Sequence, residues 1–265
     1  MTKTHLAVAN NTAASNIISF IRGGEQSGAN AGWKLGDVFH SSPLSIGTPN
    51  VLFYDRWDKS SPKSFDLYRT DNERKSTNGK RIILIGANDG QLHAFQTGEL
   101  PGTGGQEVWS FVPPNLLPKL QFIAHSSHPT SLLHHYYVDG PTSAADIWLK
   151  GSAASATAIG ETYKTKDQWH TYMVMSEGRG GISTLWSSSA NCNSNFNSAY
   201  TSTYSHYCGY YAFDVTNTLT TPPTFKWKLG GTSGVSATAG AQLGQAWSKM
   251  FMGRGRIENV ERWVG

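Results

Sequence analysis

The chain has 265 residues, a formal net charge of +4 and a charged fraction of only 15%, while Gly and aromatic residues are plentiful. Lys and Arg never form a run longer than two residues, which argues against the clustered basic patch of a nucleic-acid-binding protein. No apolar stretch approaches the roughly 18 residues that a membrane-spanning helix needs.

Residues 1–34 are predicted to lead into the folded part of the chain. Within them, residues 13–22 have the spacing of a short amphipathic helix that Gly23-Gly24 would end. The first seven residues lack the long apolar core of a secretory signal peptide. We therefore expect either that the leader of an exported protein lies elsewhere or that this chain is a fragment.

A first sheet is predicted over about 35–112. Residues 35–47 are extended and rich in small side chains, which suits an inner strand that is crowded near an axis. The polar and charged residues 54–80 are predicted to be an excursion at the surface.

The rest of this first sheet follows from a hairpin pattern. The apolar run 82–85 and residues 91–95 flank Asn88-Asp89-Gly90, which is typical of a tight turn between two strands. Trp109 is predicted to lie on the outer strand, and the proline-rich residues 113–118 then break the sheet.

A second sheet is predicted over about 136–230. It opens at residues 136–145, where small side chains again follow a Pro. Residues 170–175 form its next strand, and Trp227 lies on its outer strand.

The two predicted sheets share a repeated motif. Ala94-Phe95 precedes Trp109 by the same 14 positions, counted from the Phe, that separate Ala212-Phe213 from Trp227. Repeated β units that each end in an aromatic strand are typical of propeller blades. The sequence therefore predicts an all-β propeller of four-stranded antiparallel blades, with Trp109 and Trp227 as the blade-closing aromatics.

The predicted propeller, residues 35–265, is partial. Residues 243–254 echo residues 35–47, so 243–265 is expected to start a third blade. Propellers typically have four to eight blades, and two blades with part of a third cannot close a ring. We expect a longer parent chain to supply the remainder.

Cys192 and Cys208 lie at the two ends of a polar loop that has no core pattern of its own. A disulfide between them would keep this loop ordered and would contribute roughly 3 kcal/mol for a loop of about 15 residues. Such a bond implies an oxidising compartment. The alternative is two unpaired thiols, and with only His206 nearby the set of zinc ligands is incomplete.

No catalytic motif or cofactor-binding motif stands out. His134-His135 follows His125 and His128, but Asp139 is the only nearby carboxylate and the spacing fits no standard metal site. Arg179 lies among glycines and could receive an anion, although an exposed hairpin tip is the simpler interpretation. The sequence predicts no catalytic residue, no cofactor and no metal ligand.

Five blocks in this order resemble the β-propeller domain of the PilY1/PilC proteins, which are type IV pilus-associated assembly factors and adhesins. The resemblance runs from about residue 20 to residue 256. The blocks are Leu-Gly-Asp-Val-Phe-His-Ser-Ser-Pro (35–43), Ile-Gly-Ala-Asn-Asp-Gly-Gln-Leu-His-Ala-Phe (85–95), Trp-Ser-Phe-Val-Pro-Pro-Asn-Leu-Leu (109–117), Tyr-Tyr-Val-Asp-Gly-Pro-Thr (136–142) and Tyr-Ala-Phe-Asp-Val-Thr (211–216).

The resemblance implies a non-catalytic parent protein that is exported to the cell surface, the pilus tip or the outer membrane. It would contact pilins or minor pilins, and a host or abiotic surface, in pilus biogenesis, attachment and twitching motility. Some family members bind calcium through alternating Asp residues in the propeller, but that acidic pattern is missing here. Binding is expected in the loops 54–80, 152–168 and 183–208.

Two other classes share the blade signature. A quinoprotein dehydrogenase has a similar repeat, which Ala87–Phe95 and Trp109 match. Such an enzyme needs a complete ring around pyrroloquinoline quinone, and many members place adjacent cysteines beside it. A structural scaffold for outer-membrane assembly is the other alternative.

Overall fold

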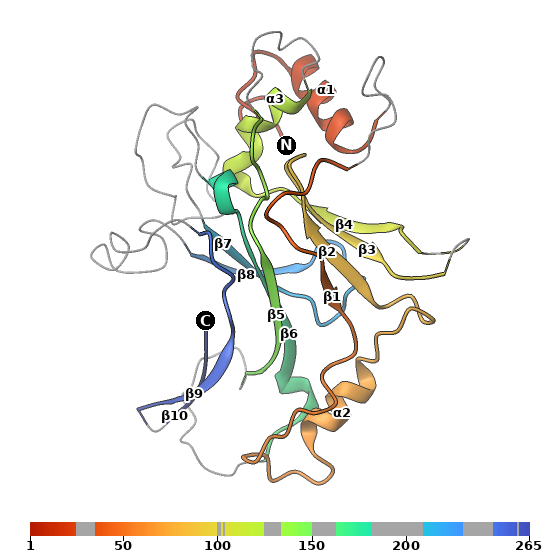
Figure 1. Cartoon of the computed structure of the whole chain (residues 1–265), viewed down its shortest axis with the longest axis vertical. Helices are drawn as coiled ribbons and strands as arrows, with labels where there is room; N and C mark the ends of the chain where they lie inside the picture. Colours follow the sequence, from red (N-terminus) through yellow and green to blue (C-terminus); the bar gives the residue numbers. More distant parts are fainter. Residues whose placement is uncertain are drawn as a thin grey trace.

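The computed structural model describes residues 1–24, 35–99, 102, 104–124, 134–149, 163–181, 209–229, 246–258 and 260–265. Most of the described secondary structure is β-strand, with a few short helices (Figure 1). The elements are α1 (Asn11–Ile21), β1 (Leu44–Ile46), α2 (Ser64–Asp71), β2 (Ile82–Gly86), β3 (Leu92–Gln96), β4 (Glu107–Phe111), η1 (Pro114–Leu120), α3 (Gln121–Ala124), β5 (Thr142–Trp148), η2 (Lys166–Gln168), β6 (Trp169–Ser176), η3 (Gly178–Gly181), β7 (Tyr210–Asp214), β8 (Thr224–Leu229), β9 (Gly253–Ile257) and β10 (Val260–Val264).

The strands form two sheets of four strands and one hairpin. The sheets have the orders β1-β2-β3-β4 and β5-β6-β7-β8, each strand antiparallel to its neighbours, and β9 pairs with β10. Each sheet is therefore a simple up-and-down meander of sequential strands. The prediction of an all-β fold built from four-stranded antiparallel blades is confirmed. The exact residue bounds assigned to each blade stay predictions.

The repeated Ala-Phe and Trp residues occupy the same register in both sheets. Ala94 pairs with Trp109 and Ala212 pairs with Trp227. In each sheet the register shifts immediately after that Ala, which is the signature of a β-bulge between the third and the fourth strand. Trp109 is buried and its indole N–H donates to the Thr218 carbonyl (3.0 Å), whereas Trp227 is half-buried.

A hydrophobic core joins the two sheets. Ile82 and Leu84 of β2 are fully buried, as the alternation of a half-buried strand requires. From β4, the Phe111 ring contacts the rings of Tyr211 and Phe213 on β7, with centroids 5.6 and 4.7 Å apart. The sheets therefore stack face to face, and each fully buried apolar side chain contributes about 1.5–3 kcal/mol.

The two helical regions at the start of the chain and after β4 lie together. The expected amphipathic helix is α1, and the Asn10 side chain caps it by accepting a hydrogen bond from the Ala13 N–H (2.9 Å). η1 and α3 form where the prolines end the first sheet, and α3 packs against α1 (Figure 1).

Residues 54–80 leave the first sheet between β1 and β2 and are exposed at many positions, as an excursion at the surface would be, but part of the segment is buried. This segment contains α2, on which Phe65 and Tyr68 are buried because residues three apart share one helix face. Arg74 is also buried, and its guanidinium donates to the Gly47 carbonyl, the Thr171 hydroxyl and the Thr216 carbonyl. The segment therefore packs against the second sheet.

Candidate functional site at the blade insertions

Two insertions meet at one end of the molecule. One lies between β1 and β2, and the other precedes β6; residues 50–72 and 163–168 are here called the insertion face (lower part of Figure 1). The two segments are joined directly, because the Ser60 hydroxyl donates to the Lys164 carbonyl (2.6 Å) and accepts from the Lys164 N–H (3.1 Å).

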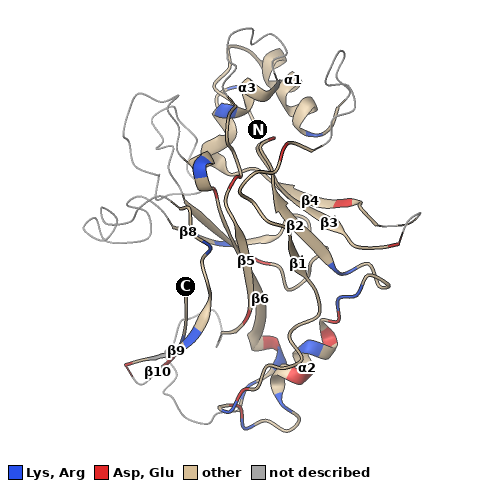
Figure 2. Cartoon of the chain, viewed as in Figure 1, with Lys and Arg blue, Asp and Glu red and all other residues tan. Residues whose placement is uncertain are grey.

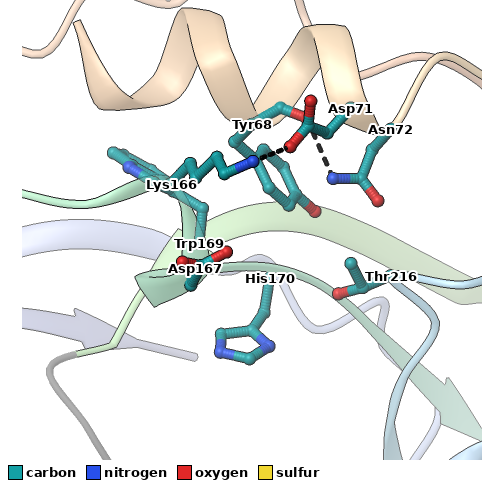
Figure 3. Close-up of a pocket in the computed structure, with 8 residues that line it drawn as sticks. All are labelled: Tyr68, Asp71, Asn72, Lys166, Asp167, Trp169, His170 and Thr216. Atoms are coloured by element: carbon teal, nitrogen blue, oxygen red, sulfur yellow. Dashed lines mark hydrogen bonds and ion pairs between the residues drawn. The ribbon is translucent and has the colours of Figure 1, made fainter.

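A cavity of about 220 Å³ opens where α2, η2 and β6 meet (Figure 3). Tyr68 and Trp169 form its floor, since these side chains are almost completely buried. The mouth is polar. Its lining residues are Tyr68, Asp71, Asn72, Lys166, Asp167, Trp169, His170 and Thr216.

The cation at the mouth is already paired. The Lys166 ammonium contacts the Asp71 carboxylate, and this hydrogen bond raises the pKa of Lys166 (Figure 3). The Asn72 side-chain amide donates to the Tyr68 carbonyl (2.9 Å) at the end of α2. The cavity can therefore offer hydrogen bonds from polar groups, but its lysine is engaged across the gap between the two insertions.

A histidine, a carboxylate and a hydroxyl lie beside this cavity. His170 Nδ1 is 2.8 Å from Asp214, and the Thr216 hydroxyl donates to the same carboxylate (2.6 Å). Burial raises the pKa of Asp214, but the hydrogen bonds from His170 and Thr216 outweigh it and lower the pKa to about 2. The hydroxyl bonds the carboxylate and not the imidazole, so this arrangement does not match a nucleophile–base pair. Its hydrogen bonds connect β6 to β7.

A buried network of charged side chains holds the insertion face to β9 and β10. The Lys164 ammonium lies 2.7 Å from Asp55 and 2.9 Å from Glu261, and Arg254 lies 2.8 Å from Asp55. Lys164 has no exposed side-chain surface and lies 3.9 Å from the centre of the Trp148 ring. Two cations and two carboxylates balance there, which is the condition under which buried charges are tolerated.

Asp58 organises the turn between these charges and α2. Its carboxylate accepts from the Ser60 N–H (2.8 Å), the Ser64 N–H (2.7 Å) and the Ser64 hydroxyl (2.6 Å). Burial raises the pKa of Asp58, but the hydrogen bonds from Ser64 and Ser60 outweigh burial and lower the pKa below its ordinary value. Trp169 donates from its indole nitrogen to the same Ser64 hydroxyl (2.9 Å), which ties the turn to β6.

A second buried polar cluster lies between the blades, away from the insertion face. Glu177 is completely buried, and burial raises its pKa to about 8. It accepts from the Asn115 side chain (2.9 Å), which in turn accepts from the Tyr211 hydroxyl (2.8 Å). Burial also lowers the pKa of the nearby Lys119 to about 8. Sequence reasoning missed this cluster; its one signal was a Glu directly after an apolar strand.

Several residues that the sequence singled out are placed as structural groups. His134 contacts Asp37 (2.9 Å), and the exposed Arg179 lies over the ring of Tyr136 (4.4 Å to its centre). The described ranges contain no group of three side chains able to hold a metal ion, and none of their helices is long and apolar enough to cross a membrane.

Some residues behind the predicted disulfide, the predicted binding loops and the histidines weighed as metal ligands lie outside the described part of the chain. These residues are Cys192 and Cys208, the whole loop 183–208, and His125 and His128. Of the loop 152–168, only residues from 163 onward are described. The disulfide stays a prediction.

Comparison with known proteins identifies the family. Residues 35–202 match the family described as the PilY1 beta-propeller domain. A type IV pilus biogenesis factor PilY1 homolog from Xylella fastidiosa is 30% identical over 177 residues, which are 64% of this chain and 12% of that protein. The type IV pilus biogenesis factor PilY1 of Pseudomonas aeruginosa PAO1 is 27% identical over 176 residues, 64% of this chain and 13% of that protein.

A second Xylella fastidiosa PilY1 homolog is 31% identical over 155 residues, 56% of this chain and 8% of that protein. The chain thus spans 8–13% of the length of these relatives. No solved structure matches the chain. With two four-stranded antiparallel blades and a family match over most of its length, the chain belongs to the PilY1 beta-propeller domain family and folds as a partial β-propeller.

Proposed function

We propose that this chain is a non-catalytic part of a type IV pilus biogenesis factor and acts through protein contacts. The family match over residues 35–202 supports this proposal, as do relatives whose names identify them as type IV pilus biogenesis factors. Because the chain covers a small share of those relatives, its role is proposed for the longer protein that would contain it.

The observation that carries the proposal is the construction of the insertion face. Residues far apart in the chain converge on Lys164, which is fully buried and pairs with the almost fully buried carboxylates of Asp55 and Glu261. A rigid base of this kind presents loops in fixed positions at little entropic cost, which favours binding. The polar groups near the cavity, His170 and Asp214, are used in hydrogen bonds between strands.

The finer parts of the proposal concern place and partners. We propose that the parent protein acts at the cell surface or pilus tip after export, contacts pilins or minor pilins, and supports attachment and twitching motility without a bound cofactor. We also propose a Cys192–Cys208 disulfide. Thiol labelling of the non-reduced, exported protein should find neither sulfur free; two labelled cysteines would contradict the bond.

The central experiment is gene deletion followed by complementation in the bacterium that encodes the chain. Deletion should abolish surface pili or twitching, and the wild-type gene should restore them. A Lys164→Ala gene should restore them poorly, because it leaves two buried carboxylates with one cation. A Lys75→Ala gene is the matched control, since Lys75 pairs with Glu73 at the surface. Normal piliation in the deletion strain would refute the proposed function.

The non-catalytic part of the proposal has a separate test. The purified parent protein is mixed with pyrroloquinoline quinone, and quinone absorbance and alcohol oxidation are followed. We expect neither bound quinone nor turnover, and observed turnover would favour the dehydrogenase alternative.

A further inference from the structure

The floor of the cavity between α2, η2 and β6 is apolar toward a ligand. The Tyr68 hydroxyl is hydrogen-bonded to the Thr171 hydroxyl (2.7 Å), and the Trp169 indole N–H donates to the Ser64 hydroxyl (2.9 Å). The polar groups of both floor residues are therefore engaged within the protein. What Tyr68 and Trp169 offer in the cavity is the carbon of their rings, which packs well against an apolar face.

The mouth of the cavity, in contrast, has polar groups whose hydrogen-bonding capacity is only partly used. The Asp71 carboxylate contacts the Lys166 ammonium through one oxygen, which leaves the second oxygen and two of the three ammonium N–H groups. Asp167 is exposed, and its carboxylate makes no hydrogen bond within the described ranges. A ligand at the mouth can therefore bond to acceptors and to a donor.

His170 and Asn72 add further groups to this mixture of donors and acceptors. His170 Nδ1 lies 2.8 Å from the Asp214 carboxylate, which accepts only, so Nδ1 carries a proton and Nε2 of the neutral ring keeps a lone pair. The Asn72 amide donates one N–H to the Tyr68 carbonyl and retains a second N–H and its oxygen. Donors and acceptors are therefore present both on the α2 side and on the η2 and β6 side of the mouth (Figure 3).

The cations around the cavity are paired with carboxylates. Residues of both signs lie close together around α2 (lower part of Figure 2). The pairs are Lys166 with Asp71, Lys226 with Asp214 (3.6 Å), and Arg74 with Asp146 through the Thr171 hydroxyl between them. No strong net charge therefore selects a charged ligand.

A neutral ligand follows from this arrangement. An anion would lie beside the carboxylates of Asp71 and Asp167, and a cation would compete with Lys166 for the same two groups. An apolar ligand would leave the polar groups of the mouth without partners, which costs free energy. The ligand that suits the cavity is neutral and carries groups that both donate and accept hydrogen bonds.

We propose that this cavity binds the terminal neutral pyranose residue of a glycan. Each ring hydroxyl both donates and accepts, so the hydroxyls match the mixed groups of the mouth, and the C–H face of the ring matches the apolar floor. A flexible polyol has the same hydroxyls but loses more conformational entropy on binding. The inference adds a ligand to the proposed protein contacts and does not rest on them.

The size and the opening of the cavity agree with one sugar ring at the end of a chain. Its volume of about 220 Å³ is below the roughly 300–1,000 Å³ of pockets for drug-sized ligands. Lys166 and Asp71 at its mouth are about half exposed. The next sugar residue of a glycan can therefore continue from the mouth into solvent.

Titrations of the whole chain, followed by ligand-observed NMR, test the class of ligand. The probes are the methyl pyranosides of glucose, galactose and mannose, the methyl glycosides of the matching uronic acids and 2-amino sugars, and sorbitol as an open-chain polyol. We expect at least one neutral pyranoside to bind with a Kd of about 1 mM, and its charged counterparts and sorbitol to bind at least about tenfold more weakly. A charged counterpart that binds as tightly, or no saturable binding of any neutral pyranoside, would refute the proposal.

Variants of the whole chain locate the site. Asp167→Ala and Lys166→Ala each remove one exposed polar group of the mouth and should weaken binding of the preferred pyranoside by about tenfold. Their thermal unfolding midpoints should stay at the wild-type value, which separates lost binding from misfolding. Lys75→Ala is the matched control, since it breaks an equally exposed pair with Glu73 that does not line the cavity. Unchanged binding in both cavity variants, or an equal loss in the control, would refute the location.

A disaccharide distinguishes the end of a glycan from a free monosaccharide. The preferred pyranose is linked through its anomeric oxygen to a second neutral sugar, and the same NMR titration is repeated. Binding at least as tight as that of the methyl pyranoside is expected, because the second ring lies outside the mouth. Binding weakened by about tenfold or more would refute the assignment to a glycan end.

Discussion

The stacked blades and the insertion face are held together by different interactions. Between the blades, apolar side chains such as Leu84 and Phe213 are almost fully buried, and their stability comes from burial that has no directional requirement. At the insertion face, Lys164, Asp55 and Glu261 are equally buried but charged. This comparison teaches that the loss of one blade side chain costs the burial and the cavity at that position, whereas the loss of one member of the charge network leaves its partners buried with an uncompensated charge.

The largest effect is expected from breaking the network at its centre. Lys164→Ala should reduce the free energy of unfolding by about 3–5 kcal/mol, because two carboxylates stay buried with only Arg254 to balance them. Urea denaturation followed by tryptophan fluorescence measures this change. A loss no larger than that of a surface lysine variant would show that the network is not a stabilising unit.

The second-largest loss of stability is expected when a buried side chain in the core of a blade is truncated. Leu84→Ala removes a fully buried side chain of β2 and should cost about 3 kcal/mol through lost burial and a residual cavity. Leu52→Ala is the matched control, since this leucine is exposed, and should stay within about 0.5 kcal/mol of wild type. Equal effects of the two substitutions would contradict the placement of Leu84 in the core.

The third prediction concerns pH and the first blade. Burial lowers the pKa of His93, but hydrogen bonds to Asp89 and Glu107 outweigh it and raise the pKa to about 9 from an ordinary value of 6.5. Because the folded-state pKa is the higher one, this stabilisation is complete below pH 6.5 and is lost as pH rises through about 9.

Urea midpoints at pH 6.5 and pH 9 check it in wild type and in His93→Gln. Other groups titrate in the same window, including Glu177 and Lys119, so the difference between the two proteins isolates His93. The wild-type midpoint should fall more steeply with pH than that of the variant. Parallel pH profiles would mean that the carboxylates do not hold the imidazolium.

The smallest effect on stability is expected at Lys166, only two residues from Lys164, where the largest effect is expected. Lys166 lies at the mouth of the cavity, and both it and Asp71 are about half exposed. Water and salt screen such a pair, so Lys166→Ala should shift the thermal unfolding midpoint too little to measure. A loss comparable to that of Lys164→Ala would end the distinction between the buried network and the exposed pair.

The blades were predictable because their signals are local. The apolar run of β2, the Asn-Asp-Gly turn and the Ala-Phe to Trp spacing each lie within one strand pair, and both sheets repeat them. The equal register of Trp109 and Trp227 follows from this repeat. The repeat could not predict that Trp109 is buried and Trp227 only half-buried, because the burial of each Trp depends on what packs against its outer strand.

The insertion face could not be predicted in the same way. The polar composition of residues 54–80 hid an aromatic face of only one helical turn, Phe65 and Tyr68. Lys164 has no local signal at all, because Asp55 and Glu261 lie 109 and 97 positions away in the chain. Only the three-dimensional meeting of those segments distinguishes this lysine from the exposed Lys166.

The long sequence separation within the charge network also bears on the order of folding. Arg254 and Asp55 are 199 positions apart, so the network can close only after residues 55–261 have been synthesised. Pairings this distant form slowly, since a large loop must close before they contribute. We therefore expect the segment around Asp55 to stay protease-sensitive, with Asp55 unpaired, until β9 and β10 emerge and dock.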